Sequence, residues 1–399
     1  MNRIEQGSAK NQMTPQTGTA LGVTRRGWLG TAGVALAAAC APTAAPAPAG
    51  APSAAGSAAP PGWQAEWDEL VKAAKQEGKL VLVTSVGESL RTAALAFEQA
   101  FPGIVVEHTG LNASNFVPRM LQERKGGIYT YDVMLQTTTS VWRLLRPEGA
   151  LDPVRPLIVR PDATDDAGWR DGFKDGFLDK GKQECYAFVV EKSQLLWVNT
   201  DAVGPNEVTK PADLLNPKWK GKLVAPDVRA GGSGYTTTSL RLALGDEGFK
   251  RFYTEQEPRV SRDLRQMTEW MARGIAAIGV GAVQPPILKE FLDQGVGKNL
   301  KYLELDRMDY VSSGSQGSTI FKVNRAPHPN AAKLFINWLL TREGQTLWTR
   351  ITEQNSRRTD VDPFNANGVP TRGKTYIKID TEEMLDEVNR TAEVAKTLG

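Results

Sequence analysis

Residues 79–86 read Lys-Leu-Val-Leu-Val-Thr-Ser-Val, a continuous apolar run of the length of one strand. A run without polar alternation is typical of a strand that is covered on both faces, as in a parallel sheet. A helix pattern precedes it at 64–77, and a helix at 88–101, a strand at 104–108, a helix at 114–125 and a strand at 132–136 follow. Strands and helices that alternate at this spacing predict right-handed βαβ units and an α/β fold.

The rest of the chain continues this alternation. Apolar runs predict further strands at 185–191, 194–199, 222–226, 274–280, 299–305 and 318–323. Helical periodicity predicts helices at 234–254, 262–272, 285–294, 329–350 and 382–397. The Gly/Pro-rich stretches between them are only as long as turns. We therefore expect two α/β lobes that the chain crosses more than once, rather than two domains in succession.

Two segments carry a family resemblance. Residues 326–340 read APHPNAAKLFINWLL and are followed by Arg-Glu-Gly-Gln at 342–345. This segment resembles one found in bacterial solute-binding proteins of ABC importers, in the branch that includes ferric-iron and thiamine binders. Residues 216–223, Asn-Pro-Lys-Trp-Lys-Gly-Lys-Leu, which lead into Asp227, are similar to the same branch. The resemblance covers roughly residues 64–360 and does not specify the ligand.

The resemblance implies the type II periplasmic-binding fold, in which paired hinge strands join two α/β lobes and the ligand lies in the cleft. On this basis lobe one is expected at 63–181 and 307–360, and lobe two at 182–306 and 361–399. The protein is expected to act as a monomer that captures a small, anionic solute, needs no cofactor, and presents the solute to a permease and its ATPase. His328, between two prolines at a helix start, is then interpreted as part of a structural turn, and Phe335 and Trp338 as core residues.

In open α/β sheets the binding crevice forms outside the carboxyl ends of the strands. In lobe one these ends are rich in small hydroxyl and amide residues, and each begins a helix with free N–H groups that favour an anion. Helix capping explains such residues equally well. The candidate ligand residues of lobe one are Ser85, Gly87, Glu88, Asn112, Ser114, Thr137 and Thr138.

In lobe two, a glycine-rich turn at 227–237 leads from a strand into a helix. Such a turn with an arginine beside it suits a phosphate, sulfate or carboxylate, but it lacks the Lys-Ser/Thr ending of a nucleotide P-loop. The resemblance also places the family's anion-contacting loop here. Trp197 and Asn199 are candidates for the cleft wall, although Trp197 also reads as a packed core residue. The candidates of lobe two are Trp197, Asn199, Arg229, Ser233, Gly234, Tyr235 and Gln284.

Ferric-binding relatives typically carry two adjacent tyrosines in lobe two. The corresponding turn here, residues 281–286, has no tyrosine, and the chain contains no Tyr-Tyr pair. The two histidines, His108 and His328, lie far apart without metal-ligand spacing. No metal ligands are therefore assigned, and a ferric-iron or ferric-chelate site remains the alternative to an anionic solute.

The N-terminal 62 residues differ from the rest. Residues 24–30, Thr-Arg-Arg-Gly-Trp-Leu-Gly, contain Arg25 and Arg26 and resemble the twin-arginine export motif. Cys40 follows three alanines and resembles a lipoprotein processing site, although Ala37 stands where such sites usually carry Leu; ordinary cleavage nearby is the alternative. Residues 41–62 contain only Ala, Pro, Thr, Gly and Ser, which predicts a disordered tether. These features predict a lipid-anchored protein outside the cytoplasm.

Charge and cysteine usage exclude other functions. The first 40 residues hold four basic residues and one acidic residue, and the rest of the chain holds equal numbers of both. This balance argues against nucleic-acid binding, which needs a clustered basic surplus. Cys185 lies in an apolar strand and has the character of a packed thiol. The sequence has no Gly-x-Ser-x-Gly motif. An enzyme is therefore disfavoured, whereas a sensor subunit that uses the same cleft stays open.

Overall fold

The computed structural model describes residues 62–228, 234–313 and 317–398. The proposed export residues Arg25 and Arg26, the proposed lipidation site Cys40, and the tether up to residue 61 lie outside the described residues, as do Arg229 and Ser233.

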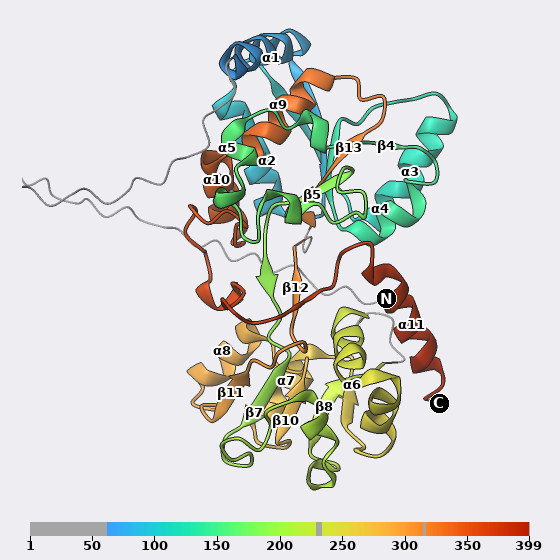
Figure 1. Ribbon diagram of the computed structural model, residues 1–399, viewed down its shortest axis with the longest axis vertical. Helices are drawn as coiled ribbons and strands as arrows, with labels where there is room; N and C mark the ends of the chain where they lie inside the picture. The colour runs from blue at the N-terminus through green and yellow to red at the C-terminus, as the bar shows by residue number, and fades with distance from the viewer. Residues whose placement is uncertain (1–61, 229–233, 314–316, 399) are drawn as a thin grey trace, which may run out of the picture. The chain divides into compact units, whose positions relative to one another are not determined.

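The first large sheet lies in lobe one (Figure 1). It has the strand order β2-β1-β3-β13-β4, with β5 also paired to β13. Strands β1, β2 and β3 are parallel, and β13 runs antiparallel to its neighbours. The strands are β1 (Lys79–Thr84), β2 (Val105–Gly110), β3 (Val133–Gln136), β4 (Leu151–Asp152), β5 (Cys185–Ala187) and β13 (Thr319–Val323).

Helices cover both faces of this sheet. Leu80 and Leu82 of β1 pack in the cluster with α1, α2, α9 and α10, whereas Val81 and Val83 pack with α3 and α4. This alternation explains the unbroken apolar run, because both faces of β1 are buried. The helices are α1 (Trp63–Glu77), α2 (Glu88–Ala100), α3 (Ala113–Lys125), α4 (Thr138–Leu144), α5 (Pro161–Thr164), α9 (Pro329–Leu339) and α10 (Arg342–Thr352).

The second large sheet has the order β11-β7-β10-β8-β9. Its strands are β7 (Leu196–Asn199), β8 (Leu223–Pro226), β9 (Arg259–Ser261), β10 (Ile278–Val280) and β11 (Leu300–Leu303). Strand β7 is antiparallel to both β10 and β11, whereas β8, β9 and β10 are parallel. Helices α6 (Gly234–Thr254), α7 (Leu264–Ala272) and α8 (Pro285–Asp293) cover this sheet.

Two short strands join the large sheets. The chain passes from β5 through β6 (Glu191–Lys192) to β7, and from β11 through β12 (Tyr310–Ser312) to β13. Strands β6 and β12 pair antiparallel, and β14 (Ile377–Lys378) pairs with β12. The two-lobed α/β fold with paired hinge strands is therefore confirmed.

Several boundaries differ from the sequence prediction. Strand β5 belongs to the first sheet, so the first crossing lies at β6 rather than at residue 182. Residues 329–350 form two helices instead of one, because the Thr341 side chain accepts a hydrogen bond from the amide of Gly344 and starts α10. The C-terminal helix α11 (Met384–Lys396) packs on α6, but β14 before it pairs with the hinge, so 361–399 is not confined to lobe two.

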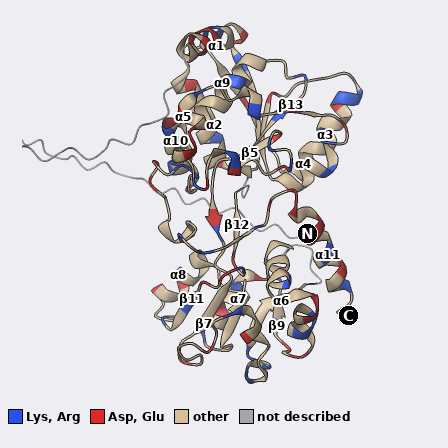
Figure 2. Cartoon of the chain, in the orientation of Figure 1, with Lys and Arg blue, Asp and Glu red and all other residues tan. Residues whose placement is uncertain are grey.

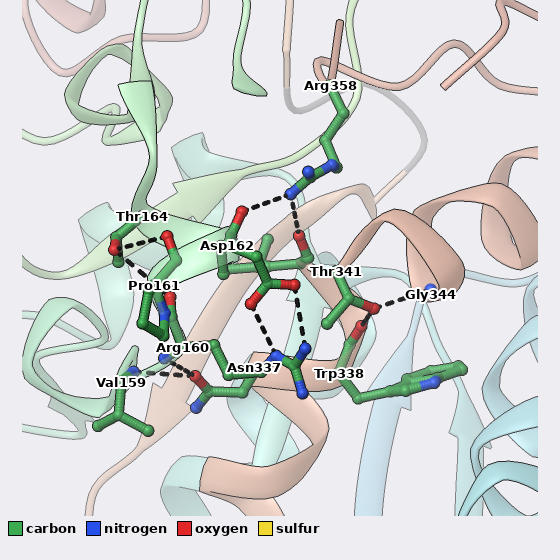
Figure 3. A network of polar contacts seen from close by, with 12 residues as sticks. Val159, Arg160, Pro161, Asp162, Thr164, Asn337, Trp338, Thr341, Gly344 and Arg358 are labelled. Carbon is green, nitrogen blue, oxygen red and sulfur yellow. Dashed lines mark hydrogen bonds and ion pairs between the residues drawn. The ribbon is translucent and has the colours of Figure 1, made fainter. Parts of the chain in front are cut away.

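A polar network fixes α9 and α10 in lobe one (Figure 3). Asn337 of α9 accepts hydrogen bonds from the amides of Val159 (2.9 Å) and Arg160 (3.2 Å). Its amide nitrogen donates to the carbonyl oxygens of Leu157 and Lys333. The buried Arg358 donates to the carbonyls of Asp162 and Leu340. The segment that carries the family resemblance is thus part of the lobe-one framework.

Candidate functional site

A cavity of about 470 Å³ lies at the hinge. The hinge strands contribute Glu191 and Tyr310, the turn after β10 contributes Gln284, and the segment after α10 contributes Asn355 and Phe364. Residues from both hinge strands, from the turn after β10 in lobe two and from the segment after α10 in lobe one therefore border one space. A volume of this order accommodates a small molecule.

Strand direction explains why these residues meet. The carboxyl ends of the parallel strands β8 and β10 lie at one edge of the second sheet, and α6 and α8 begin just beyond them. Since β7 is antiparallel, its first residue lies at this edge, and Gln194 and Leu195, which come directly before β7, border the cavity.

The cavity wall carries amides and two glutamates, Glu191 and Glu353. Glu191 is partly buried, and its Oε2 accepts a hydrogen bond from Asn355 Nδ2 at 3.0 Å. Burial raises the pKa of this carboxyl group, although the hydrogen bond from Asn355 and the nearby charge of Lys192 oppose the shift. Lys192 also borders the cavity, but its ammonium pairs with Glu304 at 2.9 Å and contacts Thr371. The paired Lys192 is therefore not a ready anion ligand.

At two glycines the backbone lies very close to side chains at the cavity wall. Gly281, at φ +60°, borders the cavity, and a Cβ placed there would lie 2.3 Å from Cγ2 of Thr236 in the first turn of α6. Gly368 similarly lies against the carboxylate of Glu191, where a Cβ would be 2.2 Å from Oε1. Neither position has room for a side chain unless its neighbour moves.

Two tyrosines from distant parts of the chain meet at the hinge. Tyr235 in the first turn of α6 and Tyr310 of β12 have ring centroids 6.1 Å apart. Burial raises the pKa of both phenols above the usual value for tyrosine. Side-chain hydrogen bonds oppose this shift in part: Tyr235 has them with Thr139 and Thr138, and Tyr310 has one with Thr236. At neutral pH both hydroxyl groups are therefore protonated.

The lobe-one candidates gather at the carboxyl edge of their sheet but do not border the cavity. Ser85 donates to Oε1 of Gln136 at 3.4 Å, and Thr138 is buried and donates to the carbonyl of Asp380 at 3.1 Å. The others occupy helix starts: Gly87, Asn112 and Thr137 are N-cap residues, Glu88 is the first residue of α2, and Ser114 lies in the first turn of α3.

The lobe-two candidates divide into two groups. Gln284 borders the cavity, and Gly234 and Tyr235 begin α6, whose Thr236 borders it. Trp197 is buried in the cluster with α7 and α8, and Asn199 lies at the far end of β7, where it accepts a hydrogen bond from Asn299. The antiparallel direction of β7 places Asn199 at the edge opposite the cavity.

Sequence reasoning missed the hinge contributions. The sequence pattern places Glu191 at the end of a longer strand at 185–191 and indicates no site role for Tyr310 or for the segment at 353–365. A two- or three-residue hinge strand has too few positions for a recognisable period, so the sequence offered no signal for Tyr310.

Comparison with known proteins identifies the family. The model for the bacterial extracellular solute-binding protein family matches residues 80–350. The chain belongs to this family. An uncharacterized Haemophilus influenzae protein is 30% identical over 158 residues, which are 38% of this chain and 43% of the relative, so the match spans less than half the length of that protein.

Solved structures show the fold of this solute-binding family member. A Trichodesmium protein (IdiA, FutA), in complex with iron and citrate ligands, has a TM-score of 0.60 at 18% identity and covers 81% of this chain and 99% of its own. A Bordetella ferric binding protein has a TM-score of 0.59 at 17% identity, covering 80% and 99%. A Mannheimia haemolytica ferric iron-binding protein in an open conformation has a TM-score of 0.56 at 15% identity, covering 80% and 97%. These likenesses show the two-lobed periplasmic-binding fold.

Proposed function

We propose that this protein is the substrate-binding component of an ABC importer. It captures a small polar solute in the hinge cavity, closes around it, and delivers it unchanged to a membrane permease and its ATPase. The observation that carries this proposal is a cavity bordered by both hinge strands and by residues from both lobes. Closure around a ligand by hinge motion suits this geometry.

The proposal places the protein outside the cytoplasm as a monomer. Membership of an extracellular solute-binding family supports this location. No helix in the described residues is long and apolar enough to cross a bilayer. We therefore assign membrane attachment to a lipid on Cys40, after export directed by Arg25 and Arg26.

The proposed solute carries an anionic group. The first turn of α6 borders the cavity through Thr236, and the free N–H groups of a helix start favour negative charge. Arg229 and Ser233 stand just before this helix in the sequence. Because Glu191 of β6 and Glu353 at the end of α10 also border the cavity, we place the anionic group at α6, away from these two carboxylates.

The anion assignment is tested with a combined Arg229→Ala and Ser233→Ala variant. A charged hydrogen bond contributes about 1.5–3 kcal/mol, so we expect at least tenfold weaker binding of a solute found by thermal-shift screening of anions. Calorimetry measures the affinity. Unchanged affinity would remove this loop from the site.

The cavity assignment is tested with Gln284→Ala. Gln284 borders the cavity at the start of α8, whereas the exposed Gln294 at the end of the same helix serves as the matched control. We expect Gln284→Ala to weaken solute binding and Gln294→Ala to leave it unchanged. Equal affinities in both variants would contradict the assignment.

Ferric iron, free or as a chelate, is the second candidate. The observation that favours it is the pair Tyr235 and Tyr310, since phenolate oxygens are hard ligands and the two rings meet at the hinge. Addition of ferric citrate is then expected to produce a visible phenolate-to-iron absorption band that Tyr310→Phe removes. A wild-type spectrum equal to the sum of the separate spectra of protein and ferric citrate would leave the organic solute as the ligand.

A further inference from the structure

A second cavity lies on the other face of the hinge. Its volume is about 280 Å³, and it is bordered by residues 170–175, by Arg357 and by the segment 370–378 around β14. In β12, Tyr310 borders the first cavity and Val311 borders the second. Because successive side chains of a strand point to opposite faces, the two cavities lie on opposite sides of the hinge sheet.

The second cavity has a surplus of positive charge. Four cationic side chains and two carboxylates border it, namely Arg170, Arg357, Lys374, Lys378, Asp171 and Asp175. The body of the protein as a whole is charge-balanced, and basic and acidic side chains are interspersed over it (Figure 2). The net positive surplus is therefore a local property of this cavity.

Two of the four cations are already paired. Asp175 Oδ1 lies 2.5 Å from Lys378 Nζ, and its Oδ2 lies 3.4 Å from a guanidinium nitrogen of Arg357. Arg357 is almost fully buried and also donates to the carbonyls of Ala187 and Arg170. Arg357 and Lys378 thus belong to the framework of the cavity, with Asp175 as their shared counter-ion.

The other two cations lack a strong partner. Among the described residues, the guanidinium of Arg170 forms no ion pair, and its one hydrogen bond reaches the carbonyl of Pro370 at 3.5 Å, the limit for such a bond. Lys374 lies 3.8 Å from Asp306, and both side chains are exposed, so water screens that pair. Arg170 and Lys374 therefore provide the uncompensated charge.

We propose that this cavity binds a small oxyanion, either inorganic phosphate or sulfate or a small carboxylate. A guanidinium can hold two oxygens of such an anion at once, and the Lys374 ammonium adds a point charge from the C-terminal segment. The bound anion would connect the loop at 170–175 to the segment at 370–378, directly beside β12. It would therefore stabilise one arrangement of the hinge without entering the solute cavity.

The test is calorimetric titration of the full mature protein with inorganic phosphate, sulfate and citrate, at constant ionic strength set by chloride. We expect saturable binding of at least one of these anions to the wild type. Phosphate or sulfate binding identifies an inorganic occupant, and binding of citrate alone identifies a carboxylate.

The decisive variants are Arg170→Gln combined with Lys374→Gln, and Lys374→Gln alone. We expect the double variant to bind at least tenfold more weakly and the single variant, which alters only an exposed side chain, to bind severalfold more weakly. Arg273→Gln combined with Lys289→Gln, an exposed basic pair in lobe two with the same charge change, is expected to retain wild-type affinity.

The Arg229→Ala and Ser233→Ala variant distinguishes anion binding in the second cavity from anion binding in the solute cavity. It alters only the loop assigned to the solute cavity, so anion binding in the second cavity is expected to persist in this variant. No saturable anion binding by the wild type, or equal loss of affinity in the lobe-two control, would overturn the proposal. Either result would leave the solute-binding function untouched, because that function rests on the other cavity.

Discussion

At the scale of single residues, Asn337 shows why the family segment has its sequence. Its side chain uses both its oxygen and its nitrogen, connecting α9 to the backbone of residues 157–160 (Figure 3). Gly344 is equally constrained, since a Cβ there would lie 2.1 Å from the carbonyl oxygen of Trp338. The family segment at 326–345 indicates the fold because its side chains hold the framework of lobe one together. Since these contacts lie within lobe one, the segment does not specify the ligand.

Asn337→Leu is predicted to destabilise the protein by about 2–4 kcal/mol. The substitution removes the partner of two amides and of the carbonyls of Leu157 and Lys333, and each buried group left unsatisfied costs about 1–3 kcal/mol. Urea denaturation followed by circular dichroism measures the change. Asn115→Leu, at an exposed position of α3, is the matched control and is expected to stay within about 0.5 kcal/mol of the wild type. Equal stability of Asn337→Leu and the wild type would contradict the role given to this side chain.

Asp309 links the hinge to the cavity wall. It is fully buried and accepts hydrogen bonds from the amide of Leu195 at 2.8 Å and from the hydroxyls of Ser193 and Tyr302. Burial raises its pKa from 3.8 to about 6, and the hydrogen bonds oppose this shift only in part. The folded protein therefore binds this proton more tightly than the unfolded chain does.

Because the folded protein binds this proton more tightly, its free energy of unfolding falls as the pH rises. The stabilisation from the protonated Asp309 is fully present below pH 4 and is lost as the pH rises to about 6. Relative to Asp309→Asn, the wild type is predicted to lose about 2 kcal/mol of unfolding free energy between pH 4.5 and pH 7. Urea denaturation of both proteins at the two pH values measures this difference. A difference that stays constant with pH, or that changes in the opposite direction, would contradict the prediction.

At the scale of elements, the regular strands and helices of both lobes could be predicted from the sequence. The run at 79–86 and the helices beside it are long enough for their periodicity to be read. The sequence also predicts strand β7, but it does not predict the direction of this strand. The pattern of apolar residues does not reveal whether a strand runs parallel or antiparallel to its neighbours. That direction decides whether Asn199 or Gln194 faces the cavity.

The C-terminal segment connects the lobes beside the hinge. Asp380 accepts hydrogen bonds from Ser312 and Ser313 at the end of β12, and Glu382 pairs with Arg146 of lobe one at 2.7 Å. Helix α11 then packs on α6, where the buried Arg241 donates to Thr391 at 2.8 Å. This segment therefore restrains the angle between the lobes.

Glu382→Gln combined with Asn389→Ala is predicted to widen the range of hinge motion, since both residues contact arginines of lobe one while α11 stays packed on α6. Electron-paramagnetic-resonance distances between labels at Lys125→Cys and Lys289→Cys are expected to become longer and more broadly distributed. Lys396→Gln, which breaks only a pair within α11, is the control. Identical distributions in the double variant and the control would show that the segment does not restrain the hinge.

At the scale of the whole molecule, the two-lobed architecture was predictable, whereas the composition of the cavity was only partly so. Gln284 and the start of α6 were found because they follow strands of recognisable length. Glu191, Tyr310 and Asn355 come from the hinge and from a loop after α10, and only the tertiary fold brings them together. Cavities formed between lobes depend on such long-range contacts, which local sequence patterns do not encode.

Cys40→Ala is predicted to move the protein from the membrane fraction to the soluble fraction. The proposed attachment to the membrane is a lipid on the Cys40 thiol, and alanine has no thiol that could carry it. Fractionation of cells followed by immunoblotting measures the distribution, with Cys185→Ala as the control at a buried thiol in lobe one. Retention of Cys40→Ala in the membrane would contradict lipid anchoring.

The central claim is that the two lobes close on a solute in the hinge cavity. It is tested most directly by small-angle X-ray scattering of the wild type and of Gln284→Ala, with and without the most stabilising solute from a thermal-shift screen. The account predicts a smaller radius of gyration for the wild type on addition of solute, and a lesser change for the variant at the same concentration. A solute that binds tightly while the radius of gyration of the wild type stays constant would contradict it.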